Sequence, residues 1–229
     1  FWTVVVLVAI GFIMIFSSSS YSAYFEYDGD RYKIVKKQII WTIMGFAAMY
    51  ITMNFNYHYY KKLTKPIYII VFALLLFVII GAKLGITSLV PNIKGATRWI
   101  YIGPLSIQPS ELAKYAIVIT LATLMDKRKN KIRDFKYGTL FYVVVGLSMA
   151  GLVFLQNSLS VTIIIMAVTL IMIFVAGGQF SHVFAVGITG IAGAICYILS
   201  TEFRRARFLN YLDPWKDASD VGYQLVHSL

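Results

Sequence analysis

Apolar residues run along this chain in long blocks separated by shorter polar stretches. Seven blocks are each close to the roughly 20 residues that a helix needs to cross a ~30 Å hydrocarbon layer. They are residues 1–19, 38–56, 66–86, 109–125, 137–155, 159–176 and 182–201. One such block also suits a buried core helix, but seven in succession do not suit a soluble domain. The pattern predicts an all-α fold, a polytopic transmembrane helical bundle with about seven spans.

The polar stretches alternate between long and short, which places the long ones on one side of the membrane. The long stretches are 20–37, 87–108 and 202–229, and the short links are 57–65, 126–136 and 177–181. Lysine and arginine are denser in the short links, and loops rich in these residues stay in the cytoplasm. We therefore expect residues 1–229 to form a single transmembrane domain with a cytoplasmic N-terminus and the long loops facing outward.

Composition supports a membrane protein and narrows its partners. The chain is 59% hydrophobic and 14% charged, with a mean hydropathy of +0.74. A soluble domain is nearer one quarter charged. The net charge of +11 lies in loops between spans. It therefore favours membrane lipids or an anionic lipid-linked substrate over nucleic acid.

Cysteine and histidine indicate no structural cross-link. The single cysteine, Cys196, has no partner within the chain, and His58, His182 and His227 lack metal-ligand spacing. No cofactor is certain, and a divalent-cation requirement stays open. The chain begins at Phe1 without a visible cleavable signal peptide, and we expect it to be part of a longer protein.

Two ionisable residues stand where the fourth block begins. Pro109 suits the first turn of a helix, and Ser110 and Glu111 suit its positive end. Lys114 is opposed by the helix dipole and by lipid, yet it shares a face with Glu111 at i,i+3 spacing and with Gln108 one turn earlier. We expect this face to line a protein cavity, although a pair that only pins two helices together remains the alternative.

Further polar features lie on the outward side. The sequence 156-QNSLS-160 interrupts two spans and suits a tight turn. Cations beyond the membrane exits suit either loop solvation or an anion-binding surface, since arginine binds phosphate oxygens in a bidentate manner. They are Lys94, Arg98, Arg204, Arg205 and Arg207.

The segments 95-GATRWIYIGPLSIQPSELAK-114 and 207-RFLNYLDPWKDASDVGYQLVHSL-229 resemble the SEDS family, that is, the FtsW, RodA and SpoVE proteins. The opening GFIMIFSSSSYSA also fits, and the second motif favours the FtsW/SpoVE branch. One departure is the absence of an acidic residue at Ser158, which excludes a carboxylate role there.

The resemblance implies a ten-helix membrane glycosyltransferase that polymerises lipid II at the outer face of the bacterial plasma membrane, in division or sporulation. It also implies a class B penicillin-binding protein as partner. The catalytic aspartate implied by the family lies beyond Leu229, so residues 1–229 are expected to be inactive alone, and Lys114 matches the lysine that pairs with it.

The reaction needs a general base and cations that neutralise the departing pyrophosphate. Lys114 and Glu111 are the catalytic candidates, with Asp213 a weaker carboxylate. The substrate-binding candidates are Arg98, Trp99, Gln108, Ser110, Arg204, Arg205 and Arg207. A lipid II flippase is the alternative, although it would need polar residues along a path through the bilayer, whereas the ionisable groups here gather near the outer side. A scaffold that only recruits a partner would not need Lys114.

Overall fold

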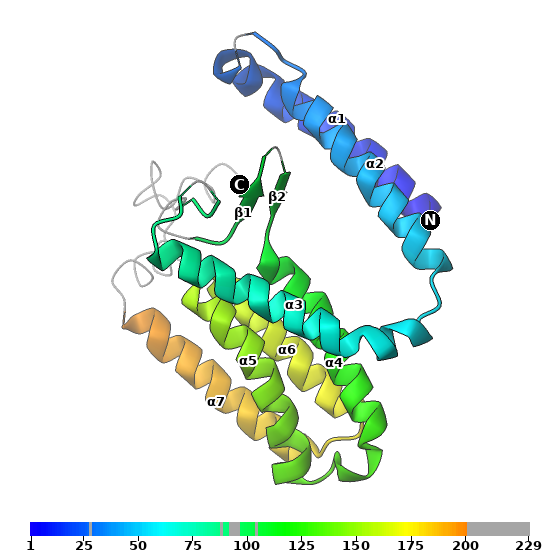
Figure 1. Ribbon diagram of the computed structural model, residues 1–229, viewed down its shortest axis with the longest axis vertical. Helices are drawn as coiled ribbons and strands as arrows, with labels where there is room; N and C mark the ends of the chain where they lie inside the picture. The colour runs from blue at the N-terminus through cyan, green and yellow to red at the C-terminus, as the bar shows by residue number, and fades with distance from the viewer. Residues whose placement is uncertain (28, 88, 92–96, 104, 201–229) are drawn as a thin grey trace. The chain divides into compact units, whose positions relative to one another are not determined.

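The computed structural model describes residues 1–27, 29–87, 89–91, 97–103 and 105–200. Within these ranges the chain is helical apart from one two-stranded sheet, which confirms the predicted all-α class (Figure 1). The helices are α1 (Trp2–Glu26), α2 (Lys33–Asn54), α3 (His58–Lys83), α4 (Pro109–Lys127), α5 (Phe141–Leu155), α6 (Leu159–Val175) and α7 (Phe180–Leu199). Two short helical turns, η1 (Lys129–Lys131) and η2 (Phe135–Leu140), precede α5. The chain divides into two compact units, Phe1–Tyr59 and Tyr60–Leu229.

The first unit is an antiparallel pair of helices, α1 and α2 (Figure 1). The ring of Phe1 lies 6.4 Å from that of Phe46, and the ring of Phe16 stacks on Tyr32 at 5.5 Å. These contacts fix the two helices side by side along their length. Within the described residues no side chain of α2 is buried, so the outer faces of this pair are apolar and exposed.

Helix α1 continues to Glu26, seven residues past the predicted span. Serines favour helix ends when their hydroxyls compete for backbone groups outside the helix. Here Ser18 and Ser19 donate back to the carbonyl of Ile15, at 3.3 and 2.6 Å. Their hydroxyls are therefore satisfied within the helix, and the serine run does not end it.

The second unit is a bundle of five helices, α3 to α7, with its core between α3, α4, α5 and α6. Fully buried side chains come from each of these four, including Leu75, Ile117, Met149 and Ile165. Burial of a large aliphatic side chain contributes about 1.5–3 kcal/mol when water is the alternative. Between helices in lipid, close packing takes over much of that role.

Helices α5 and α6 approach each other closely at Gly146. A Cβ added at Gly146 of α5 would lie 2.5 Å from the Oγ1 of Thr169 on α6, which leaves room only for hydrogen. Thr169 is fully buried and donates its hydroxyl to the carbonyl of Ile165 at 2.8 Å. Glycine at position 146 is therefore required by the approach of the two helices.

Among the described residues, five helical stretches are long and apolar enough to cross a membrane. They are Trp2–Tyr21, Lys33–Asn54, His58–Lys83, Phe135–Leu155 and Phe180–Leu199. Helix α6 is a shorter apolar helix of 17 residues, and α4 has 19 residues but carries four charged ones. The predicted polytopic membrane bundle is thus confirmed, and α4 is the helix that departs most from a plain lipid-crossing composition.

Two predicted loops differ from the structure. Helix α3 begins at His58, eight residues before the predicted span, because 58–65 contains no helix breaker and Thr64 bonds back to Tyr60. The long segment 87–108 was expected to be an outward loop, and it contains the paired strands β1 (Ile100–Ile102) and β2 (Leu105–Ile107). β-Branched and aromatic residues on both sides of Gly103, which has a φ of +60°, explain the hairpin.

Candidate functional site

The hairpin β1–β2 leads directly into the start of α4. Gln108 follows β2 with extended backbone angles, and Pro109 occupies the first helical turn, where its missing N–H costs nothing. The backbone N–H of Glu111 donates to the carbonyl of Gln108 at 3.0 Å. The helix therefore begins where the sequence predicted, and its first turn is fixed beside the hairpin.

Glu111 and Lys114 form an ion pair on one face of α4. The Nζ of Lys114 lies 2.7 Å from an oxygen of Glu111, and the two side chains are 28% and 48% exposed. The pairing predicted from the i,i+3 spacing is confirmed. An ammonium group has three donors, and a single carboxylate does not use them all. Lys114 is thus partly shielded and able to bind a further acceptor.

The other candidates at this end of α4 differ in exposure. Ser110 is fully buried, and its hydroxyl has no hydrogen-bond partner among the described residues. Gln108 and Trp99 are half-buried, and the Gln108 side chain makes no capping bond to the helix. A buried hydroxyl without a partner costs about 1–3 kcal/mol, so Ser110 needs a reason to be polar.

Arg98 contacts the turn between α5 and α6. Its Nε donates to the carbonyl of Gln156 at 3.4 Å, and its Nη2 donates to the carbonyl of Asn157. Asn157 has a φ of +59°, which is uncommon outside glycine but tolerated by asparagine. The guanidinium fork holds this turn with two of its five donors. Its remaining donors have no partner among the described residues.

Gln156 was not a predicted site residue, yet it links three segments. Its side chain is 1% exposed, and its Nε2 donates to the carbonyl of Leu75 in α3 at 3.1 Å. Its Oε1 has no partner within the described residues. The 156–160 segment is the predicted tight turn, with Ser158 buried at the start of α6. In the sequence, the only sign of a structural role for Gln156 is that this segment interrupts the apolar pattern.

Several predicted residues lie outside the described ranges. They are Lys94, Arg204, Arg205, Arg207 and Asp213. Their proposed contact with an anion therefore stays a prediction. Among the described residues, no three histidine, cysteine, aspartate or glutamate side chains gather as a metal site.

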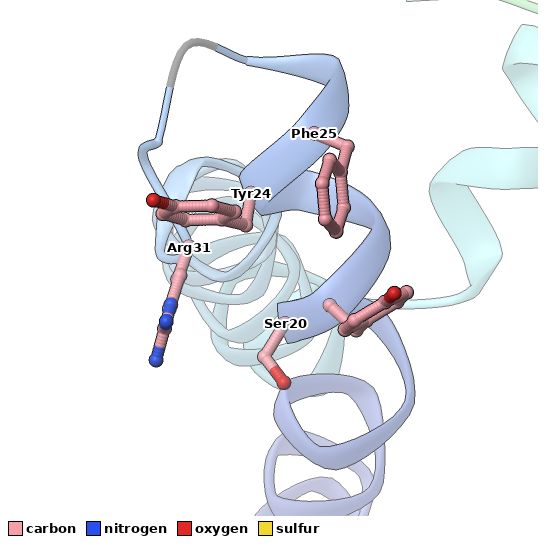
Figure 2. Close-up of a pocket in the computed structure, with 5 residues that line it drawn as sticks. Ser20, Tyr24, Phe25 and Arg31 are labelled. Carbon is pink, nitrogen blue, oxygen red and sulfur yellow. The ribbon is translucent and has the colours of Figure 1, made fainter.

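A separate pocket lies in the first unit, at the end of α1 (Figure 2). It is lined by Ser20, Tyr21, Tyr24, Phe25 and Arg31 and has a volume of about 300 Å³. The Arg31 guanidinium lies 4.9 Å from the centre of the Tyr24 ring, a cation–π contact. Beside it, a hydrogen bond from Lys36 lowers the pKa of Asp30. None of the predicted site residues lines this pocket.

A known protein family matches the whole chain. Residues 1–229 match the family model for FtsW, RodA and SpoVE, described as "Cell cycle protein". The chain is 32% identical over 225 residues to a probable peptidoglycan glycosyltransferase FtsW from a Geobacter species, covering 98% of this chain and 59% of that protein. It is 31% identical over 223 residues to stage V sporulation protein E of Bacillus subtilis, covering 97% of this chain and 59% of that protein. The chain thus spans about three fifths of these relatives.

Solved structures share the fold. One, described as "Structural coordination of polymerization and crosslinking by a peptidoglycan synthase complex", has a TM-score of 0.68 at 23% identity and covers 95% of this chain and 63% of that one. The rod shape determining protein RodA of Thermus thermophilus has a TM-score of 0.58 at 21% identity, covering 80% and 57%. At these identities the likeness shows the fold alone.

Proposed function

The chain belongs to the FtsW/RodA/SpoVE family of cell cycle proteins, and from this membership we propose that the full-length protein is a peptidoglycan glycosyltransferase. It polymerises lipid II into glycan strands at the outer face of the bacterial plasma membrane, during division or sporulation. The match of the family model to residues 1–229 carries the proposal. The names of two relatives, a probable glycosyltransferase and a sporulation protein, agree with it.

The Glu111–Lys114 pair has a positioning role in the proposed reaction. The 4-hydroxyl of one GlcNAc attacks the anomeric carbon of a MurNAc that bears undecaprenyl pyrophosphate, and the pyrophosphate leaves with the electron pair of the broken C–O bond. A carboxylate takes the hydroxyl proton, a contribution of roughly 10²–10⁴-fold. We assign that role to a carboxylate of the full-length protein outside residues 1–229. Lys114 positions it, and Glu111 is a secondary carboxylate.

Charge on the departing pyrophosphate needs nearby donors. Arg98 is a candidate because two of its donors hold the α5–α6 turn while others have no partner among the described residues. Arg204, Arg205 and Arg207 complete the proposed anion site, with Gln108 and Ser110 at the start of α4 and Trp99 facing sugar or prenyl groups. Fixed donors stabilise developing charge without reorganising.

The proposal also includes the orientation of the chain in the membrane and a partner protein. The N-terminus is cytoplasmic, and segments 87–108 and 202–229 face outward, toward the lipid-linked substrate. Residues 1–229 form one transmembrane domain of the full-length protein and are inactive alone. A class B penicillin-binding protein cross-links the glycan. A structural neighbour of this chain is described as part of a complex that coordinates polymerisation and crosslinking, which supports such a partner.

Lipid II polymerisation by purified full-length protein tests the proposal. Lys114→Ala is expected to lower the rate by about 10²-fold or more, as loss of positioned general-base catalysis would. Arg98→Ala is expected to lower it by about tenfold, as one donor to the developing charge is lost. The matched control is Lys83→Ala, which removes an exposed lysine from the last turn of α3.

Three outcomes would contradict the proposal. Wild-type rates in folded Lys114→Ala and Arg98→Ala proteins would remove both residues from the site. Movement of lipid II across vesicles without glycan product would make the protein a flippase instead. Neither activity, with intact partner binding, would make it a scaffold.

A further inference from the structure

Cations crowd one end of the second unit. The start of α3 and the segment from the end of α4 to η2 together carry nine cations and two carboxylates, Asp126 and Asp134. We call this the basic surface. Its cations are Lys61, Lys62, Lys65, Lys127, Arg128, Lys129, Lys131, Arg133 and Lys136.

An ion-pair network joins the two segments of the basic surface. One oxygen of Asp126 lies 2.5 Å from the Nζ of Lys61, and the other lies 3.1 Å from the Nζ of Lys129. Residues 61 and 126 are 65 positions apart, so this contact is tertiary. The cations of α3 and those after α4 therefore form one continuous patch.

The second carboxylate is also occupied. Asp134 accepts the backbone N–H groups of Lys136 and Tyr137 at 2.8 and 3.2 Å, which caps η2. Two carboxylates already engaged cannot neutralise nine cations. Lys65 and Arg133 are exposed and have no ion-pair partner among the described residues. The basic surface therefore keeps a strong positive potential.

Aromatic rings stand among these cations. Tyr137 is 56% exposed, and the Nζ atoms of Lys131 and Lys136 lie 5.6 and 5.8 Å from its ring centre. Phe135, 46% exposed, begins a stretch long and apolar enough to cross a membrane. Aromatic side chains at the end of an apolar span are typical of the depth where lipid headgroups lie.

We propose that the basic surface binds the phosphate headgroups of anionic phospholipids in the leaflet that it faces. Clusters of four to eight cations next to a membrane span attract anionic lipid, with each cation near the surface adding about fivefold to the affinity. The Asp126 network holds Lys61 and Lys129 in place at the edge of the lipid. A soluble polyanion would not need the adjoining aromatic rings. The surface does not depend on the proposed glycosyltransferase activity.

Lipid-stripped full-length protein in detergent tests this inference by thermal unfolding during titration with phosphatidylglycerol. We expect phosphatidylglycerol to raise the unfolding temperature and phosphatidylcholine to leave it unchanged. The variant K129Q/K131Q/R133Q/K136Q is expected to need roughly 10²-fold more phosphatidylglycerol for the same half-effect. Raising the salt from about 0.1 to about 1 M should weaken the effect, because the Debye length falls from ~10 to ~3 Å.

The matched control removes four exposed lysines elsewhere, K33Q/K36Q/K37Q/K83Q, and is expected to stay within about twofold of wild type. Equal losses in both fourfold variants, or equal effects of the two lipids, would overturn the inference. An equal effect of inorganic phosphate would assign the surface to a soluble anion instead. If the test variant does not fold, Arg133→Gln and Lys65→Gln decide alone: each should raise the half-effect concentration about twofold to fivefold, and no change in either would overturn the inference.

Discussion

The two ends of α4 each carry a charge that the helix dipole opposes, and they resolve it differently. At the start, Lys114 faces the positive end and is held by one carboxylate of its own helix, at 2.7 Å. At the finish, Asp126 faces the negative end and is held by two lysines, one from α3 and one from beyond α4. The second mismatch is fully compensated by cations around an exposed carboxylate. The first leaves an ammonium with spare donors, which is the arrangement expected of a functional group.

Exchanging the charges of each pair gives the largest expected difference. The variant Glu111→Lys/Lys114→Glu keeps an i,i+3 ion pair but moves the ammonium by almost one turn. We expect lipid II polymerisation by the full-length protein to fall by about 10²-fold or more, since positioning is lost while pairing survives. The matched exchange, Lys61→Asp/Asp126→Lys, should leave the rate within about threefold, as an exposed structural pair contributes little. Retained activity in the first exchange would show that the Glu111–Lys114 pair is only structural.

The next largest expected effect is on stability, when one arginine is removed near each end of α4. Arg98→Ala deletes two charged hydrogen bonds to the carbonyls of Gln156 and Asn157, so we expect the free energy of unfolding to fall by about 1–3 kcal/mol. Arg133→Ala, which removes an exposed side chain, should change it by no more than about 0.5 kcal/mol. Thermal unfolding in detergent measures both. Equal destabilisation would mean that the Arg98 contacts do not hold the turn.

Removing two hydroxyls of α4 is expected to give a smaller difference in the free energy of unfolding. The Oγ1 of Thr123, toward the finish, lies 2.8 Å from that of Thr64 in α3, and both are buried. Thr123→Ala should lower the free energy of unfolding by about 0.5–1.5 kcal/mol. Ser110, at the start, has a buried hydroxyl without a described partner, so Ser110→Ala should be neutral or stabilising. Loss of polymerisation by Ser110→Ala in a stable protein would assign that hydroxyl to substrate.

Acid titration is expected to give the smallest effect, a change in stability that depends on Asp126 at the C-terminal end of α4. Hydrogen bonds from Lys61 and Lys129 lower the pKa of Asp126 from 3.8 to about 2. Because the folded-state pKa lies below the ordinary value, the carboxylate adds stability above about pH 4, and this contribution is lost as pH falls toward 2. Asp126→Asn should therefore flatten the stability profile between pH 4 and 2 relative to wild type. An unchanged slope would mean that the pair is not formed in solution.

Local spacing was enough to predict some of this site. The i,i+3 distance and Pro109 together predicted both the start of α4 and the ion pair, because helix geometry places such residues on one face. The apolar blocks predicted the helices for a similar reason, since the length of a span follows from the thickness of the bilayer. Their ends were less predictable, as α1 and α3 continue past the apolar residues.

Contacts between residues far apart in the sequence could not be predicted from local spacing. Nothing in the sequence joins Lys61 to Asp126 or Gln156 to Leu75, because these pairs are 65 and 81 positions apart. Arg98 was expected to meet an anion, and its bonds to the α5–α6 turn depend on a backbone conformation at Asn157 that spacing does not encode. Among the described residues, the missed β1–β2 hairpin did have a signal in the sequence, the alternation around Gly103.

The missing side chain at Gly146 has a consequence for motion. With the backbone of α5 lying directly on Thr169 of α6, the two helices have no layer of adaptable side chains between them at this point. We therefore expect the two helices to resist sliding along one another at this point. Rearrangements between helices are then expected at other helix boundaries, where longer side chains allow slippage.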